Sequence, residues 1–412
     1  MTEKFAIRIL ALDDERLMLK LLSHMLAILG FAPAVTFDSG RAALEWIDSP
    51  DNYPDLILLD LNMPEMDGVE FVRHLVERHY GGSLILISGE SERMLQTVTK
   101  LVRAHKIQVL GHLRKPITLE GLNSLLEKWT PPSQSELLAA KKIYSADEVR
   151  AAISNGELIN YYQPKVEVAT GRVVGVETLV CWNHPDDGIV FPIQFIGVAE
   201  AHGLIDDLTR VVLAGALAQA RVWQDAGLTL RIAVNVSMGN LGSLNFADFV
   251  AGEIAAAGIP PQQVVLEVTE SQLMEDPRAP LEVLTRLRMK RIRLSIDDFG
   301  TGHSSLAQLR DIPFNELKID QSFVHGAWDN GTVRAMFDAS LGLAKQLDME
   351  VVAEGVEDRD DWDFLRKTEC DIAQGYFIAK PMRAASLPDW INSWQIRLQK
   401  ELATAPQAMG IR

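Results

Sequence analysis

Along the first 130 residues, short apolar runs alternate with segments in which apolar residues recur at helical spacing. The apolar runs predict strands at 7–12, 34–37, 56–59, 84–87 and 108–110. The helical spacing predicts helices near 16–29, 40–48, 68–79, 91–104 and 119–129. Five strands that alternate with helices predict a doubly wound, five-stranded parallel sheet. In such a sheet the functional site lies at the carboxyl ends of the strands.

A proline-containing segment, 129–135, ends this first block, because paired prolines stop a helix. Ser145 and Glu148 have the spacing of a capping box, which predicts a helix that starts there and ends near Asn155-Gly156. We therefore expect a first domain over 1–130, a linker over 131–145, a second domain over 146–400 and a C-terminal tail over 401–412.

The second block repeats a simple order, in which an apolar strand ends in a polar residue and a helix follows. Strands whose polar residues all lie at their carboxyl ends are typical of a (β/α)8 barrel, with its active site on that face. A doubly wound sheet is the alternative, but it would not bring seven strand ends around one point. The polar residues in question are Glu177, Asn235, Glu267, Asp297, Asp298, Lys318, Glu354 and Gln374.

Composition narrows the class of protein. The chain has 412 residues, of which 47% are hydrophobic and 23% charged, as in a soluble globular protein. It has no apolar run long enough for a membrane span and no basic segment typical of a signal peptide near Met1. Its two cysteines form no pattern, so we expect a reducing cytoplasm. The net charge of −16 argues against DNA binding, which needs a basic face.

Polar side chains gather at the strand ends of the first block. Asp13 and Asp14 follow the first predicted strand, Asp60 the third, Ser88 the fourth and Lys115 the fifth. A Mg²⁺ ion would offset the repulsion between the carboxylates, and Ser88 and Lys115 have the chemistry to bind a phosphoryl group. Any one of these residues alone is better explained as a cap or a surface charge, but together they predict a site.

The barrel residues listed above offer oxygen ligands without cysteine or histidine, which favours Mg²⁺ or Mn²⁺ over zinc. Such a site suits metal-assisted hydrolysis of a phosphodiester, in which two ions bind the attacking and departing oxygens. The alternative is that each acid belongs to a structural ion pair. Lys318 is the single base in the series, so too few basic residues are present for that alternative.

Residues 5–129 resemble the receiver domain of two-component response regulators. The resemblance rests on Asp13-Asp14, the segment 59–68, Ser88-Gly89 and Lys115-Pro116. It implies that Asp60 accepts a phosphoryl group from a histidine kinase or phosphotransfer protein, and that Asp14, Asp60 and the carbonyl of Asn62 hold Mg²⁺. The chain has His112 where receivers usually carry an aromatic switch residue.

Residues from about 146 to 398 resemble an EAL domain, a phosphodiesterase that cleaves cyclic di-GMP to linear pGpG. The matching motifs start at Gln163, Glu177, Asn235, Glu267, Asp297, Lys318, Glu354 and Gln374. A receiver followed by an EAL domain is the architecture of one group of response regulators. The chain lacks the Gly-Gly-Asp-Glu-Phe motif of a diguanylate cyclase.

The resemblance also implies roles for single residues. It places one metal ion on Glu177, Asn235, Glu267 and Asp297, and a second on Asp297, Asp298 and Glu354. Glu354 is the candidate general base, Lys318 positions the attacking water, and Glu177 is counted with them as catalytic. Glu270 anchors the glycine-rich loop 299–305. The substrate contacts implied are those of Gln163, Leu179, Asn235 and Gln374. A homo-oligomer, a dimer or larger, is expected on the same ground.

Two departures from the family pattern lie near the substrate. Cys181 stands where active members usually have an arginine that contacts a substrate phosphate, and His303 stands where a tyrosine is usual. Asn183 and His184 are candidates to replace the lost donor. Two functions therefore stay open: a working phosphodiesterase, and a catalytically weak EAL domain that acts as a cyclic di-GMP receptor or a protein-interaction module.

Overall fold

The structure is a computed structural model that describes residues 7–49, 52–78, 80–90, 92–104, 107–129, 144–269, 278–300, 309 and 312–404. The chain divides into two compact units, residues 1–142 and 143–412. Within the described ranges, no helix is both long enough and apolar enough to cross a membrane.

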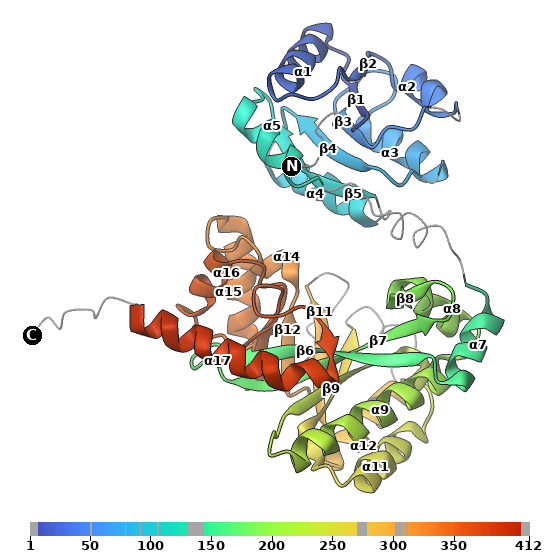
Figure 1. Ribbon diagram of the computed structural model, residues 1–412, viewed down its shortest axis with the longest axis vertical. Helices are drawn as coiled ribbons and strands as arrows, with labels where there is room; N and C mark the ends of the chain where they lie inside the picture. Colours follow the sequence, from blue (N-terminus) through green and yellow to red (C-terminus); the bar gives the residue numbers. More distant parts are fainter. Residues whose placement is uncertain are drawn as a thin grey trace, which may run out of the picture. The chain divides into compact units, whose positions relative to one another are not determined.

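The first unit alternates strands and helices as expected and forms a five-stranded parallel sheet (Figure 1). The strand order is β2-β1-β3-β4-β5, which is the order of a doubly wound fold. The elements are β1 (Ile9–Leu12), α1 (Arg16–Ile28), β2 (Val35–Phe37), α2 (Gly40–Ile47), β3 (Leu56–Asp60), α3 (Gly68–Glu77), β4 (Ser83–Ser88), α4 (Glu92–Ala104), β5 (Gln108–Arg114) and α5 (Leu119–Leu126).

Each face of this sheet has its own core, because successive side chains of a strand point to opposite faces. Leu10 and Leu12 of β1 pack with residues of α2, α3 and α4, whereas Ile9 and Ala11 pack with residues of α1 and α5. Both faces are therefore covered by helices, which explains why the strands read as unbroken apolar runs.

Strand β5 is longer than its sequence indicates, so the expected end at residue 110 is wrong. The strand continues to Arg114, and its register with β4 shifts beside Gly111, which has φ of 155°. The apolar run ends at residue 110, but Gly111 allows an irregularity within the strand, which then continues. The longer strand places Lys115 directly at its carboxyl end.

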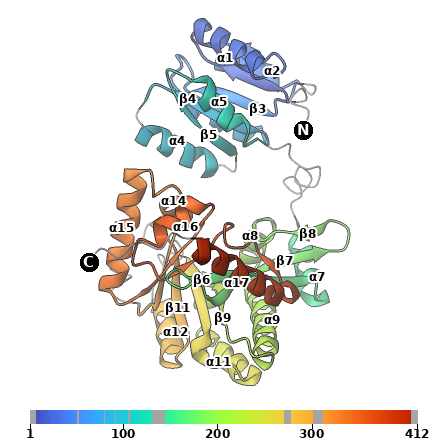
Figure 2. The same ribbon diagram turned by 60° about the vertical axis from the view of Figure 1, so that its left-hand side comes forward.

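The second unit is a closed barrel of eight strands, as expected for this block (Figure 2). Going round the barrel, the strands follow the order β6-β7-β9-β10-β11-β12-β13-β14 and back to β6, with β8 and β15 as additions beside β7 and β6. Their bounds are β6 (Leu158–Glu167), β7 (Val173–His184), β8 (Gly188–Val190), β9 (Arg231–Val236), β10 (Val264–Thr269), β11 (Arg293–Phe299), β12 (Glu316–Ile319), β13 (Glu350–Ala353), β14 (Ile372–Ala373) and β15 (Met382–Arg383).

The barrel differs from a regular (β/α)8 barrel in one strand. Strand β6 is antiparallel to both of its neighbours, β7 and β14, whereas the other seven strands run parallel to one another. The physical reason is the short connection 168–172 between β6 and β7, because a parallel pair needs a crossover of a dozen or more residues.

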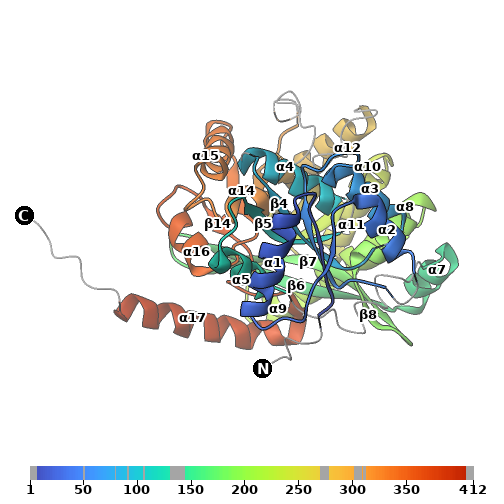
Figure 3. The ribbon, with the colours of Figure 1, turned by 90° about the horizontal axis from the view of Figure 1, so that it is seen from above.

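Helices surround the barrel, and α15 and α16 lie on the side opposite α7 and α8 (Figure 1 and Figure 3). The expected capping box is present at the start of α7, and Gly156 ends that helix in a left-handed conformation. The bounds are α7 (Ala146–Asn155), η1 (Pro192–Gln194), α8 (Ile196–Ala201), α9 (Ile205–Asp225), α10 (Met238–Leu241), α11 (Phe246–Ala257), η2 (Pro261–Gln263), α12 (Arg278–Met289), α14 (Gln321–Val324), α15 (Gly331–Gln346), α16 (Arg359–Leu365), η4 (Ala384–Ser386) and α17 (Leu387–Thr404).

Candidate functional site

The first unit brings its predicted residues together at the carboxyl edge of the sheet. The ammonium of Lys115 lies 2.9 Å from an oxygen of Asp13 and 2.8 Å from an oxygen of Asp60. Both carboxylates are buried, and Ser88, the last residue of β4, is buried as well. We call Asp13, Asp14, Asp60, Ser88 and Lys115 the sheet-edge site.

The sheet-edge site fits a divalent cation. Oxygen atoms of Asp13, Asp14 and Asp60 lie within 4.8 Å of one another. Burial raises the pKa of Asp60, and the neighbouring charge of Asp13 raises it further, although Lys115 acts against both. Three carboxylates with one lysine leave negative charge uncompensated, which is the condition under which Mg²⁺ binds oxygen ligands.

A glycine makes the turn after β3 possible. A Cβ atom on Gly68 would lie 2.7 Å from the carbonyl oxygen of Asp60 and 2.8 Å from Cα of Leu61. The backbone of α3 therefore starts directly against the end of β3, and the amide of Asn62 donates to Oδ1 of Asp60 at 3.3 Å. This close approach holds the segment after Asp60 near the carboxylate.

In the second unit, Lys318 lies at the centre of a ring of acids. Its ammonium is 2.7 Å from Glu354, 2.9 Å from Asp297, 3.0 Å from Glu267 and 3.7 Å from Glu177. The residue is 1% exposed. Burial alone would lower the pKa of Lys318, but the surrounding carboxylates raise it well above its ordinary value. This lysine is therefore held charged.

Glu177 is fixed by two amide donors. Nδ2 of Asn235 donates to one of its oxygens at 2.9 Å, and Nε2 of Gln374 donates to the other at 2.6 Å. Nε2 of Gln374 also reaches Oε1 of Gln163 at 2.9 Å, and Gln163 donates to the carbonyl of Ala379 at 3.0 Å. Asn235 and Gln374 thus hold the carboxylate of Glu177 in place, and Gln163 orients Gln374.

Glu267 is wholly buried between two lysines. Its Oε1 lies 2.5 Å from the ammonium of Lys165, and its Oε2 lies 3.0 Å from that of Lys318. Burial disfavours the charge of this glutamate, but the two lysines outweigh burial and lower its pKa to about 2. Glu267 is therefore a carboxylate at neutral pH.

The oxygens of Asp297, Asp298 and Glu354 lie within 4.8 Å of one another at the ends of β11 and β13. Burial raises the pKa of Asp298 to about 6 and that of Glu354 well above its ordinary value, and the charge of Asp297 adds to both. Asp298 has φ of 55°, a conformation uncommon for a residue other than glycine. This cluster fits a divalent cation, which would offset the repulsion.

The other residues named from the sequence are Leu179, Cys181, Glu270 and His303. Leu179 is on β7, two residues beyond Glu177 and so on the same face of the strand. Glu270 and His303 lie outside the described residues. Cys181 is a free cysteine that is 5% exposed, and burial raises the pKa of its thiol.

His184, a candidate substitute for the lost phosphate donor, lies at the end of β7. It is buried, and its Nδ1 accepts hydrogen bonds from the backbone amides of Asp186 and Asp187. Its ring also packs against Trp182 and Tyr144. Nδ1 of His184 is thus occupied by the loop that follows β7, and a role for Asn183 or His184 as a substitute donor stays a prediction.

Two charged residues of the barrel interior received no role from the sequence. Lys165 lies two residues after Gln163 on β6, and Glu316 lies two residues before Lys318 on β12. Both are buried. The sequence did contain a signal for both residues. Side chains alternate with a period of two along a strand, which places Lys165 on the same face as Gln163 and Glu316 on the same face as Lys318.

The fold and the two sites define the class of protein. It has an α/β unit with carboxylates at the carboxyl edge of its sheet, followed by a barrel with an acidic centre. The family model of the response regulator receiver domain matches residues 9–127, and that of the EAL domain matches residues 146–381. The chain therefore belongs to the EAL domain family and carries a response regulator receiver domain before the barrel, as the sequence predicted.

Two known proteins and one solved structure are similar to this chain over different shares of its length. The cyclic di-GMP phosphodiesterase RocR of Pseudomonas aeruginosa is 33% identical over 355 residues, which cover 86% of this chain and 90% of RocR. The cyclic di-GMP phosphodiesterase NbdA of the same organism is 38% identical over 271 residues, which cover 66% of this chain and 35% of NbdA. A solved structure of the PaMucR phosphodiesterase in complex with c-di-GMP is similar with a TM-score of 0.56 and 38% identity, covering 58% of this chain and 98% of that one.

Proposed function

We propose that this chain is a cyclic di-GMP phosphodiesterase that hydrolyses its substrate to linear pGpG and so lowers the level of this second messenger. The observation that carries the proposal is the ring of carboxylates around Lys318 at the carboxyl ends of the barrel strands. The similarity to RocR, which spans nearly the whole of both chains, supports the substrate.

The charge of the acidic centre around Lys318, which we call the barrel site, supports the binding of two divalent cations. The interior carries six carboxylates and two lysines, Lys165 and Lys318, so its formal charge is −4. Two ions of charge +2 would balance this, and the oxygen-rich donor set favours Mg²⁺ or Mn²⁺. The carboxylates counted are those of Glu177, Glu267, Asp297, Asp298, Glu316 and Glu354.

In this proposal Glu177, Asn235, Glu267 and Asp297 would hold one ion, and Asp297, Asp298 and Glu354 would hold the other. When bound, the ions supply charge stabilisation for the attacking and departing oxygens of the phosphodiester. Water attacks phosphorus, one ester bond breaks, and the departing oxygen receives a proton.

The protein residues around the ions then have separate tasks. Glu354 takes the proton of the attacking water as the general base. Lys318 lies 2.7 Å from Glu354, close enough to orient the same water. Gln163, Leu179, Asn235 and Gln374 bind the substrate beside the metals, and Glu270 anchors the loop after β11.

Control by the receiver unit is the second part of the proposal. Asp60 accepts a phosphoryl group from a histidine kinase or phosphotransfer protein, with Mg²⁺ on the sheet-edge site. Lys115, 2.8 Å from Asp60, is placed to pair with the transferred group. Phosphorylation then changes turnover in the barrel or the assembly of a homo-oligomer. The two free, buried cysteines agree with a cytoplasmic setting.

One observation favours a cyclic di-GMP receptor as a second candidate. Cys181 is buried where active family members carry a phosphate-binding arginine, and a thiol with a raised pKa offers a phosphate no positive charge. A receptor, however, has no physical need for an interior of charge −4. We therefore favour a phosphodiesterase over a receptor.

A matched pair of variants tests the proposal. Asp297→Asn removes a carboxylate that contacts Lys318 and belongs to the acidic cluster. Asp371→Asn changes a carboxylate that pairs with Lys345, away from that cluster. We expect Asp297→Asn to lose hydrolysis of cyclic di-GMP and Asp371→Asn to keep it. Equal turnover by the two variants would overturn the assignment of the barrel site.

A further inference from the structure

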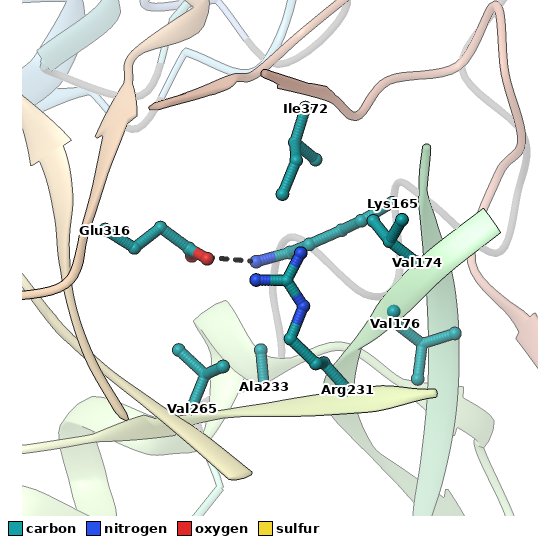
Figure 4. Close-up of a pocket in the computed structure, with 9 residues that line it drawn as sticks. Lys165, Val174, Val176, Arg231, Ala233, Val265, Glu316 and Ile372 are labelled. Carbon is teal, nitrogen blue, oxygen red and sulfur yellow. Dashed lines mark ion pairs between the residues drawn. The ribbon is translucent and has the colours of Figure 1, made fainter. Parts of the chain in front are cut away.

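A small cavity of about 10 Å³ lies inside the barrel, and Lys165, Arg231 and Glu316 are among the residues that line it (Figure 4). Lys165, Arg231 and Glu316 extend toward it from β6, β9 and β12, and Ile372 lies on another side. Arg231 is already paired, since Glu350 accepts from its guanidinium. Lys165 and Glu316 remain as an interior pair without a role in the proposed reaction.

These residues continue the ion pairs of the barrel site. From Lys318, the contacts run to Glu267 at 3.0 Å, from Glu267 to Lys165 at 2.5 Å, and from Lys165 to Glu316 at 3.5 Å. All four residues are buried. The last contact is longer than a hydrogen bond, so Lys165 is bound more closely to Glu267 than to Glu316.

The reversed direction of β6 explains how a lysine reaches this depth. Gln163 pairs with Glu177 of β7, and Lys165 pairs with Gly175, which precedes Glu177 in its strand. Moving forward along β6 therefore leads toward the amino ends of the other strands. Gln163 and Lys165 share the inner face, so Gln163 accepts from Gln374, which holds Glu177, and Lys165 contacts Glu267 from the layer below.

We propose that Lys165 is a positioning residue that orients Glu267 for metal binding by holding its Oε1, which leaves Oε2 facing the centre of the site. This inference rests on the proposed function. Side chains behind a metal ligand commonly orient it through a hydrogen bond to the ligand atom that does not face the metal. Glu316 is the counter-charge that lets the lysine remain buried.

Removing Lys165 alone would leave two buried carboxylates, Glu267 and Glu316, without that cation, which destabilises the fold whatever the role of Lys165 in metal binding. The double variant Lys165→Met/Glu316→Gln removes one positive and one negative charge together, so it keeps the net charge of the interior. The single variant Glu316→Gln keeps Lys165 on Glu267. Lys345→Met, which breaks the pair with Asp371, is a lysine control away from Glu267.

The experiment is calorimetric titration with Mn²⁺ of the full-length chain and each variant, all of them carrying Asp14→Asn and Asp60→Asn so that the sheet-edge site does not add metal binding, accompanied by thermal unfolding. We expect Mn²⁺ affinity to fall about 10- to 100-fold in the double variant, the usual loss when support behind a metal ligand is removed. Glu316→Gln and Lys345→Met should keep the affinity of the parent. Thermal unfolding should show that the double variant is folded.

The outcomes separate this inference from the proposed function. If the parent and the folded double variant bind Mn²⁺ equally, Lys165 is only part of a structural ion pair and the inference is wrong. If the parent binds no Mn²⁺, the proposed function fails and the inference fails with it. A loss of affinity confined to the double variant supports both.

Discussion

Replacing Glu177 by alanine should separate catalysis from folding. The substitution removes a carboxylate that accepts from Asn235 at 2.9 Å and from Gln374 at 2.6 Å. Each buried amide left without an acceptor costs about 1–3 kcal/mol. Burial, however, raises the pKa of Glu177, which shows that its charge is itself unfavourable in the acidic interior. These effects oppose each other, so we expect the free energy of unfolding to change by less than about 2 kcal/mol.

The effect on turnover should be far larger. A lost metal ligand removes several kcal/mol of charge stabilisation, and about 4 kcal/mol corresponds to a roughly 1000-fold lower rate. The assay is hydrolysis of cyclic di-GMP at saturating Mn²⁺, with urea unfolding of the same samples. Glu350→Ala is a matched control, since it breaks contacts with Arg231 and Arg293 and should lose stability but keep turnover. Glu177→Ala that retained turnover within about tenfold of the parent would refute the ligand assignment.

Three further predictions concern control, substrate affinity and pH. Asp60→Asn should make turnover and oligomeric state insensitive to acetyl phosphate, whereas the parent responds; a parent indifferent to the donor would end the regulatory proposal. Cys181→Arg should lower KM by about 10- to 150-fold, the worth of a charge-assisted bond to phosphate; steady-state kinetics checks this, and an unchanged or higher KM would show that the pocket is built around the cysteine. The hydrogen bond with Asp361 raises the pKa of His325. The pair therefore stabilises the fold fully when the pH is below the pKa that His325 has in the unfolded chain, and this contribution disappears as pH rises through the pKa of His325 in the folded protein. Urea unfolding of His325→Gln should therefore show a larger loss of stability at pH 6 than at pH 9, and a loss that grows with pH would contradict the pairing.

The sequence predicted both folds because apolar periodicity reports which face of an element is buried. It also placed Glu177, Glu267 and Lys318 in one site, since carboxyl ends of parallel strands converge. It did not predict the direction of β6, which depends on the length of a loop rather than on periodicity. Nor did it pair Lys165 with Glu267, because these residues lie 102 positions apart and only the closed barrel brings them together.

The most direct test of the account is incubation of the purified full-length protein with cyclic di-GMP, followed by chromatography of the products. With Mg²⁺ or Mn²⁺ present, the account predicts conversion to linear pGpG, and removal of the metal with a chelator should stop it. Parallel samples with a phosphoryl donor show whether the receiver unit changes the rate. Cyclic di-GMP that is bound but recovered intact in the presence of metal would contradict the account and favour the receptor.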